Sequence, residues 1–185
     1  MVSLLPNLLT LLRIAACPVL VLVLYSRNYE AALWLFFAAG VSDGLDGFIA
    51  KRFNCETYVG SILDPIADKL LITCAYVMLA LLGDIPFYLL VVVIFRDLVI
   101  VGGYFVLVIV TEERIPMQPI YWSKVNTFLQ IALVVFVLLE QSGWIGFGPL
   151  LDILVFGVVA TSIVSGVLYV WIWGFKRELV HEKNH

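Results

Sequence analysis

Six long runs of apolar residues, separated by short polar segments, account for most of the chain. The runs lack the alternation of apolar and polar residues that membrane-spanning strands show, so they predict α-helices. A helix needs ~20 apolar residues to cross the ~30 Å of membrane hydrocarbon. We therefore predict an all-α, polytopic integral membrane protein with six transmembrane helices, over residues 7–25, 31–50, 61–82, 87–110, 125–139 and 150–173.

The composition agrees with this pattern. Of the 185 residues, 63% are apolar and only 14% are charged, and the mean hydropathy is +1.06. A soluble domain is about half apolar and about one quarter charged. These values exclude a soluble enzyme, a nucleic-acid binder and a disordered protein. Six membrane helices take roughly 120 residues, so we predict a single membrane domain over residues 1–185.

The positions of lysine and arginine predict the orientation in the membrane. Cytoplasmic loops carry an excess of these residues. Arg27 alone lies in loops on one side, and Arg13, Lys69 and Arg96 lie inside predicted helices. The loop between the second and third helices and both termini are therefore predicted to be cytoplasmic. No organelle presequence is visible, so a bacterial inner (plasma) membrane is expected. The cytoplasmic set is Lys51, Arg52, Arg114, Lys124, Lys176, Arg177 and Lys183.

Four aspartates interrupt the apolar pattern of the second and third predicted helices. Asp43 and Asp46 are three residues apart, and Asp64 and Asp68 are four apart, so each pair shares one face of its helix. An ionised side chain at the bilayer centre costs ~2.5–3.5 kcal/mol. Four of them without compensation would cost on the order of 10 kcal/mol, comparable with the stability of a whole protein. We expect bound cations to offset this energy.

The spacing also predicts how the four carboxylates are grouped. At 1.5 Å per residue, Asp43 and Asp68 lie ~12 Å from the connecting loop, and Asp46 and Asp64 lie ~6–8 Å from it. Antiparallel neighbouring helices would therefore carry the acids in two layers. A cluster of four carboxylates suits Mg²⁺ or Mn²⁺ rather than Zn²⁺. Two divalent cations would cancel the four negative charges.

Glycines and cations next to the aspartates indicate the kind of ligand. Gly47 directly follows Asp46, and Gly60 comes four residues before Asp64; glycine lets a bulky ligand approach the backbone closely. Lys51 would supply a cation at the level of a phosphate. A carboxylate-bound metal pair at the cytoplasmic surface indicates phosphoryl-type chemistry on a pyrophosphate.

Two other interpretations stay open. The acids could be solvated at the interface or paired with Arg13, Arg96 or Lys124, and this interpretation is favoured for Asp84, Asp97 and Asp152. A divalent-cation channel or transporter could also carry acids within its helices. A transporter would more typically show an internal repeat, and none is visible here. A purely structural protein would not need all four acids.

The segment SDGLDGFIAKRFNCETYVGSILDPIADKL resembles the signature of the CDP-alcohol phosphatidyltransferases. That signature reads Asp, two residues, Asp-Gly, two residues, Ala-Arg, eight residues, Gly, three residues, Asp, three residues, Asp. Lys51 stands where the family has arginine, which keeps the charge and loses the bidentate fork. Every spacing over residues 43–68 is intact, with matches at Asp43, Asp46, Gly47, Ala50, Gly60, Asp64 and Asp68.

The resemblance implies a six-helix homodimer whose active site faces the cytoplasm and binds the lipid substrate CDP-diacylglycerol. It also implies that Asp43, Asp46, Asp64 and Asp68 hold the two metal ions, with Asp68 acting in addition as the general base. The residues that it implies for the CDP moiety are Asn7, Thr10, Gly47, Lys51, Thr57 and Gly60.

Two further segments bear on the acceptor alcohol. FRDLVIV and SKVNTFLQ resemble the single-domain cardiolipin synthases more than the phosphatidylglycerophosphate synthases, which usually carry Arg-Glu where this chain has Arg96-Asp97. The implied acceptor is phosphatidylglycerol, with glycerol 3-phosphate as the alternative. Candidate acceptor-binding cations are Arg96, Lys124 and Arg13. We predict that Arg96 does not face Asp97, because neighbouring residues on a helix point apart.

Overall fold

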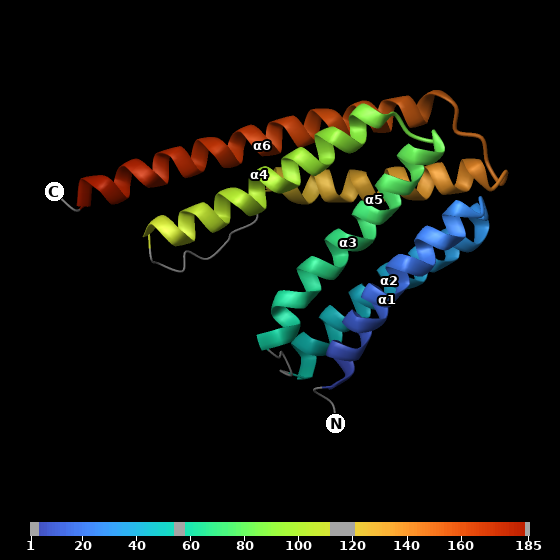
Figure 1. The fold of residues 1–185 in the computed structure, drawn as a ribbon, viewed down its shortest axis with the longest axis horizontal. Coiled ribbons are helices and arrows are strands. Elements are labelled where there is room, and N and C mark those ends of the chain that lie inside the picture. Colours follow the sequence, from blue (N-terminus) through green and yellow to red (C-terminus); the bar gives the residue numbers. More distant parts are fainter. Residues whose placement is uncertain (1–3, 54–57, 112–120, 184–185) are drawn as a thin grey trace. The chain divides into compact units, whose positions relative to one another are not determined.

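The computed structural model describes the backbone of residues 4–53, 58–111 and 121–183, and the side chains of residues 11–42, 69–103 and 121–171. The regular structure in these ranges is helical, which confirms the all-α prediction (Figure 1). The helices are α1 (Leu4–Tyr25), α2 (Tyr29–Phe53), α3 (Tyr58–Leu82), α4 (Phe87–Thr111), α5 (Tyr121–Gln141) and α6 (Pro149–Lys183).

Each predicted run lies inside one of these helices, and the largest difference is at the end of α6. The apolar pattern ends at Trp173, whereas the helix continues to Lys183. The added residues include lysine, arginine and glutamate, which are good helix formers. Leaving an apolar environment does not interrupt the hydrogen bonds of the helix, so the hydropathy pattern does not mark the helix end.

Two helical stretches are long and apolar enough to cross a membrane among the residues that were described with side chains. They are Tyr121–Gln141 in α5 and Pro149–Trp171 in α6. Shorter apolar stretches occupy Leu11–Tyr25, Tyr29–Ser42 and Lys69–Leu82. The helices that contain the shorter stretches have 22 to 25 residues. At 1.5 Å per residue each of these helices is about 33–38 Å long, which exceeds the ~30 Å of bilayer hydrocarbon.

The chain divides into two compact units, which we call unit 1 (residues 1–85 and 134–147) and unit 2 (residues 86–133 and 148–185). In unit 1, α1 packs against both α2 and α3. Its core contains Leu20 and Leu24 of α1, Phe36 of α2 and Tyr76 and Leu79 of α3, all buried. The second half of α5 also belongs to unit 1.

Two local signals determine where helices of unit 1 begin and end. The side-chain oxygen of Asn28 accepts a hydrogen bond from the backbone N–H of Ala31 (3.1 Å), which is the N-cap arrangement that starts α2. Gly83 follows the end of α3 with a φ of 85°, a conformation that favours glycine and commonly ends a helix. The hydroxyl of Tyr29 donates to the carboxylate of Asp84 (2.9 Å), which connects the start of α2 to the turn after α3.

Unit 2 contains α4, the first half of α5 and α6. α4 and α6 are in contact and run in the same direction (Figure 1). α5 runs opposite to α6, because Asn126 contacts Thr161 whereas Leu129, further along α5, lies next to Gly157, which is earlier in α6. Successive helices that cross a membrane must alternate in direction, and α4, α5 and α6 meet this requirement.

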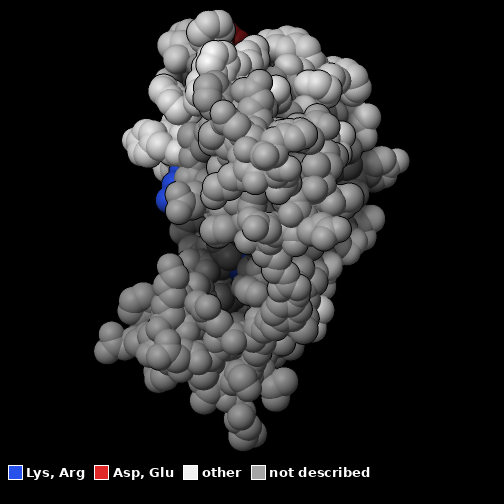
Figure 2. Space-filling model, turned by 90° about the vertical axis from the view of Figure 1, so that its left-hand side faces the viewer, with Lys and Arg blue, Asp and Glu red and all other residues white. Residues whose placement is uncertain are grey.

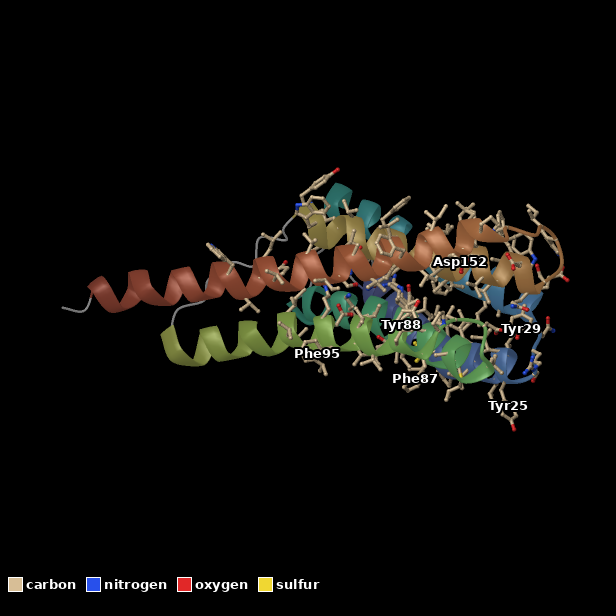
Figure 3. All side chains as sticks on the ribbon, turned by 90° about the horizontal axis from the view of Figure 1, so that it is seen from above. Tyr25, Tyr29, Phe87, Tyr88, Phe95 and Asp152 are labelled. Atoms are coloured by element: carbon tan, nitrogen blue, oxygen red, sulfur yellow. The ribbon has the colours of Figure 1, made fainter. Side chains whose placement is uncertain are left out.

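Many large apolar side chains are exposed on the described helices, as expected for surfaces that face lipid. Phe95 and Leu98 of α4, and Phe156 and Val167 of α6, are each more than half exposed. Nearly all of the described side chains on the face in Figure 2 are uncharged. Tyr25, the last residue of α1, points away from its helix (Figure 3) and is 76% exposed, as is typical of aromatic residues at a membrane interface.

Candidate functional site

The backbone places the four signature aspartates on two helices of unit 1. Asp43 and Asp46 lie in α2, and Asp64 and Asp68 lie in α3. Because both helices are continuous through these positions, the spacings of three and four residues correspond to neighbouring positions on one face of each helix. α1 contacts both helices. The predicted metal-binding residues are therefore carried by the two helices that pack on α1.

The residues predicted to bind the CDP moiety are distributed over α1, α2 and α3 where their backbone is described. Thr57 lies outside the described residues. The side chains of the four signature aspartates and of the predicted CDP-binding residues also lie outside the described ones, so their roles stay predictions. No group of three metal-ligating side chains occurs among the side chains that are described. The CDP-binding predictions with a described backbone are Asn7 and Thr10 on α1, Gly47 and Lys51 on α2, and Gly60 on α3.

The three predicted acceptor-binding cations lie in very different surroundings. Arg13 on α1 is buried, with 3% of its surface exposed, and it belongs to unit 1. Arg96 on α4 is buried to nearly the same degree in unit 2. Lys124 on α5 is exposed. A buried cation within a membrane helix needs hydrogen-bonded partners, and Arg96 shows most clearly what those partners are.

The guanidinium group of Arg96 is held from three directions. One terminal nitrogen (Nη1) donates to Oδ1 of Asp97 at 2.6 Å. The other (Nη2) donates to the hydroxyls of Ser123 on α5 (2.7 Å) and Ser165 on α6 (2.9 Å). These contacts join all three helices of unit 2. Hydrogen bonds that involve an ionised group are roughly twice as strong as neutral ones, so this cluster fixes the position of the guanidinium.

The pairing of Arg96 with Asp97 corrects the prediction that these neighbours point apart. Their Cβ atoms do diverge on the helix, but the long arginine side chain brings its terminal nitrogen back to the carboxylate. The side chain of Asp97 is 19% exposed and that of Arg96 is 4% exposed. The favoured interpretation of Asp97, a carboxylate paired with a nearby cation, agrees with this geometry. Asp84 is likewise hydrogen-bonded, to Tyr29, and Asp152 is exposed in the first turn of α6.

A second polar cluster, which was not predicted from the sequence, lies between α5 and α6. Oδ1 of Asn126, which is completely buried, accepts hydrogen bonds from Thr161 (2.9 Å) and Ser162 (3.0 Å). Asn126 is three residues after Ser123, and Ser162 is three residues before Ser165. The two clusters are therefore separated by about one helical turn, ~5 Å along the helices. Together they form a polar layer inside an apolar bundle.

Spacing was the signal that could have revealed this second cluster. Ser123, Asn126 and Gln130 recur at intervals of three and four residues within an apolar run, and so do Ser162 and Ser165. Polar residues at helical spacing in a membrane span mark a face that is turned toward other helices. These polar residues are uncharged and are surrounded by apolar ones, so they hardly lower the average hydropathy of the segment.

Replacing Arg96 by methionine is expected to destabilise the protein by about 3 kcal/mol, because Asp97 and two serine hydroxyls lose their charged partner. Adding Asp97→Asn to this variant removes the carboxylate that is left without its cation. We expect the double variant to recover part of the loss. The measurement is thermal unfolding in detergent, followed by tryptophan fluorescence.

Lys124→Met is the matched control, since Lys124 is an exposed cation on α5. Surface substitutions of this kind usually change stability by less than about 0.5 kcal/mol. Strictly additive effects of Arg96→Met and Asp97→Asn would contradict the prediction, because contacting residues that stabilise one another show a coupling energy.

Comparison with known proteins agrees with the signature on α2 and α3. The family model "CDP-alcohol phosphatidyltransferase" matches residues 3–173. The chain is 34% identical over 170 residues to a CDP-diacylglycerol–glycerol-3-phosphate 3-phosphatidyltransferase of Rickettsia bellii, covering 89% of this chain and 92% of the relative. A probable phosphatidylglycerophosphate synthase of Mycobacterium tuberculosis is 32% identical over 172 residues, covering 90% of this chain and 79% of the relative.

A cardiolipin synthase (CMP-forming) of Rattus norvegicus is 35% identical over 147 residues. The alignment covers 70% of this chain and 48% of that relative. Relatives named for phosphatidylglycerophosphate synthesis and relatives named as cardiolipin synthases thus have similar sequence identity to this chain. The match over residues 3–173, together with the apolar helices, shows that the chain is a membrane protein that belongs to the CDP-alcohol phosphatidyltransferase family, enzymes that use CDP-diacylglycerol in phospholipid biosynthesis.

Proposed function

We propose that this enzyme transfers the phosphatidyl group of CDP-diacylglycerol to a hydroxyl of phosphatidylglycerol, forming cardiolipin and releasing CMP. The observation that carries the choice of acceptor is the pairing of Arg96 with Asp97 at 2.6 Å. The carboxylate compensates the charge of the cation. Glycerol 3-phosphate brings a dianionic phosphate that needs uncompensated cations, whereas phosphatidylglycerol brings a phosphodiester with a single charge.

Asp43, Asp46, Asp64 and Asp68 would hold two divalent cations. Four carboxylates on two helices that both pack on α1 would form the all-oxygen donor set that Mg²⁺ and Mn²⁺ prefer. The use of divalent metal ions by the family supports this assignment. When bound, the cations would supply positive charge next to the pyrophosphate of the donor lipid and favour the departure of CMP. Four acids within apolar helices also require such compensation.

In this proposal Asp68 accepts the proton of the acceptor hydroxyl as the hydroxyl oxygen attacks the phosphorus of the phosphatidyl group. The bond from this phosphorus to the oxygen of CMP then breaks. A carboxylate with an ordinary pKa of about 4 is a weak base toward an alcohol. Positioning of the two reactants must therefore supply much of the rate enhancement. The CDP moiety would be bound by Asn7, Thr10, Gly47, Lys51, Thr57 and Gly60.

Arg96 would contact the acceptor headgroup, with Lys124 and Arg13 as further cations. Ser123 and Ser165 hold Nη2 of Arg96, so we assign them as positioning residues for this cation. The six helices would cross a bacterial inner membrane with both termini and the active site on the cytoplasmic side, and the protein would act as a homodimer.

One observation favours a second candidate, phosphatidylglycerophosphate synthesis. The relatives named for that reaction in Rickettsia and Mycobacterium align over 89% and 90% of this chain, whereas the rat cardiolipin synthase aligns over 70%. In that case the acceptor would be glycerol 3-phosphate. The chemistry at the four aspartates would be the same.

The acceptor can be identified with the purified full-length protein in lipid nanodiscs. We expect CMP release from CDP-diacylglycerol with Mg²⁺ or Mn²⁺ and phosphatidylglycerol, and none with glycerol 3-phosphate. CMP release with glycerol 3-phosphate alone would establish the second candidate. Vesicles that contain the protein would pass divalent cations without any CMP release if the chain were a channel or transporter.

A further inference from the structure

An apolar groove runs along unit 2 between α4 and α6. Its volume is 490 Å³, within the ~300–1,000 Å³ of ligand-binding pockets. α4 contributes residues 92–99 to the lining and α6 contributes residues 162–171. At 1.5 Å per residue the groove is about 10–14 Å long. This length is close to half of the ~30 Å of bilayer hydrocarbon, the depth of one leaflet.

The lining contains two polar residues, Arg96 and Ser162, and its other side chains are aliphatic or aromatic apart from Gly166. Both belong to the polar layer described above, since Arg96 is bonded to Ser123 and Ser165, and Ser162 is bonded to Asn126. Gly166 makes room beside Arg96. A Cβ atom at Gly166 would lie 3.9 Å from Cγ of Arg96, so the aliphatic stem of the arginine borders the space that the glycine leaves.

The dimensions of the groove favour a hydrocarbon chain as its occupant. An α-helix with its side chains is about 10–12 Å wide. A segment of that width and the length of the groove would fill on the order of 1,000 Å³ or more, about twice the available volume. The groove is therefore too narrow for a helix of a second copy of the chain. A single acyl chain fits its length, its apolar walls and its position on helices that cross lipid.

We propose that this groove binds an acyl chain of the acceptor phospholipid, next to the arginine that would contact the acceptor headgroup. The proposal rests on the proposed function, because it takes Arg96 as an acceptor-site residue. The signature aspartates that would bind the donor lie on α2 and α3 in unit 1, whereas the groove belongs to unit 2. A second lipid chain site is what a reaction between two phospholipids requires.

The first test fills the groove beside Arg96. Gly166→Leu is expected to raise the KM for dioleoyl-phosphatidylglycerol about tenfold, the effect of losing the burial of about two methylene groups. The KM for CDP-diacylglycerol and for short-chain dihexanoyl-phosphatidylglycerol should change little. Gly102→Leu is the control, since Gly102 lies on α4 outside the groove and a Cβ atom there would meet no atom within 4 Å. An unchanged KM for the long-chain lipid in a folded Gly166→Leu protein would overturn the proposal.

The second test measures binding without turnover, and so separates the groove from the proposed function. Trp171 lines the groove, and a brominated acyl chain next to it quenches its fluorescence. The quenching due to Trp171 is the difference between the wild type and Trp171→Phe, both measured in nanodiscs. We expect this difference to saturate at a low mole fraction of brominated phosphatidylglycerol. Gly166→Leu should abolish the saturation.

The site would be refuted if quenching rose only in proportion to the mole fraction of brominated lipid and did so equally with brominated phosphatidylcholine. That result would indicate ordinary surrounding lipid. Saturable quenching together with CMP release from glycerol 3-phosphate alone would leave the groove as a phospholipid site and refute the proposed acceptor.

Discussion

The Asp68→Asn enzyme is expected to release CMP at least about 100-fold more slowly than the wild type, since a positioned general base contributes roughly 10²–10⁴-fold to a rate. Asparagine keeps the size of the side chain and an oxygen that can bind a metal ion, but it cannot accept the proton of the acceptor hydroxyl. We therefore expect the KM for CDP-diacylglycerol to rise much less than kcat falls. The measurement is CMP release at saturating concentrations of both lipids.

Asp84→Asn is the matched control for this substitution. Asp84 lies in the turn after α3 and is hydrogen-bonded to Tyr29, outside the predicted metal-binding set. Its replacement should leave kcat close to the wild-type value. Wild-type turnover in Asp68→Asn would remove the general-base role, whereas loss of metal binding in that variant would make Asp68 chiefly a metal ligand.

Divalent cations are expected to raise the thermal unfolding temperature of the wild-type protein. In the proposed site, the four carboxylates on α2 and α3 would repel one another when no cation is bound. A ligand at 100 times its Kd stabilises a protein by about 2.7 kcal/mol. For a chain of this length that corresponds to about 5–10 °C. Adding Mg²⁺ or Mn²⁺ to the chelator-treated protein should produce this shift and restore activity.

The same experiment on Asp43→Asn combined with Asp64→Asn tests whether the shift comes from these residues. The variant has two carboxylates fewer, so its unfolding temperature without metal should be higher than that of the wild type, and its response to Mg²⁺ should be small. Asp152→Asn, at an exposed position in the first turn of α6, should keep the full wild-type shift. An equal response in the double variant would place the cations elsewhere.

The fold could be predicted largely because membrane helices leave a strong signal in hydropathy. Five of the six apolar runs are close to or longer than the ~20 residues that cross the bilayer. The fifth, residues 125–139, is shorter, but like the others it lies within a helix. The end of α6 at Lys183 could not be predicted in this way, because hydropathy records the apolar environment and not the hydrogen bonds of the helix. The cap at Asn28 is a local signal that would have placed the start of α2 more accurately.

The candidate site was predictable only where its chemistry depends on spacing. The aspartates form a recognisable pattern, and their positions in α2 and α3 follow from helix periodicity. Residue spacing gives the direction of each Cβ atom but not the conformation of a long side chain. The contact between Arg96 and Asp97 was therefore not predicted. The bonds of Asn126 to Thr161 and Ser162 join residues 35 and 36 positions apart, and such pairing depends on how two helices pack.

The division of α5 between the two units has a consequence for biosynthesis. Residues 1–85 are made first, but unit 1 also contains residues 134–147. Val134, Val137 and Leu138 are buried, so their positions in that unit stay unfilled until this part of α5 has left the ribosome. Residues 86–133, which include α4, must be synthesised in the interval. Unit 1 therefore stays incompletely packed while the translocon inserts α4. A nascent chain arrested at residue 133 would lack the last segment of unit 1.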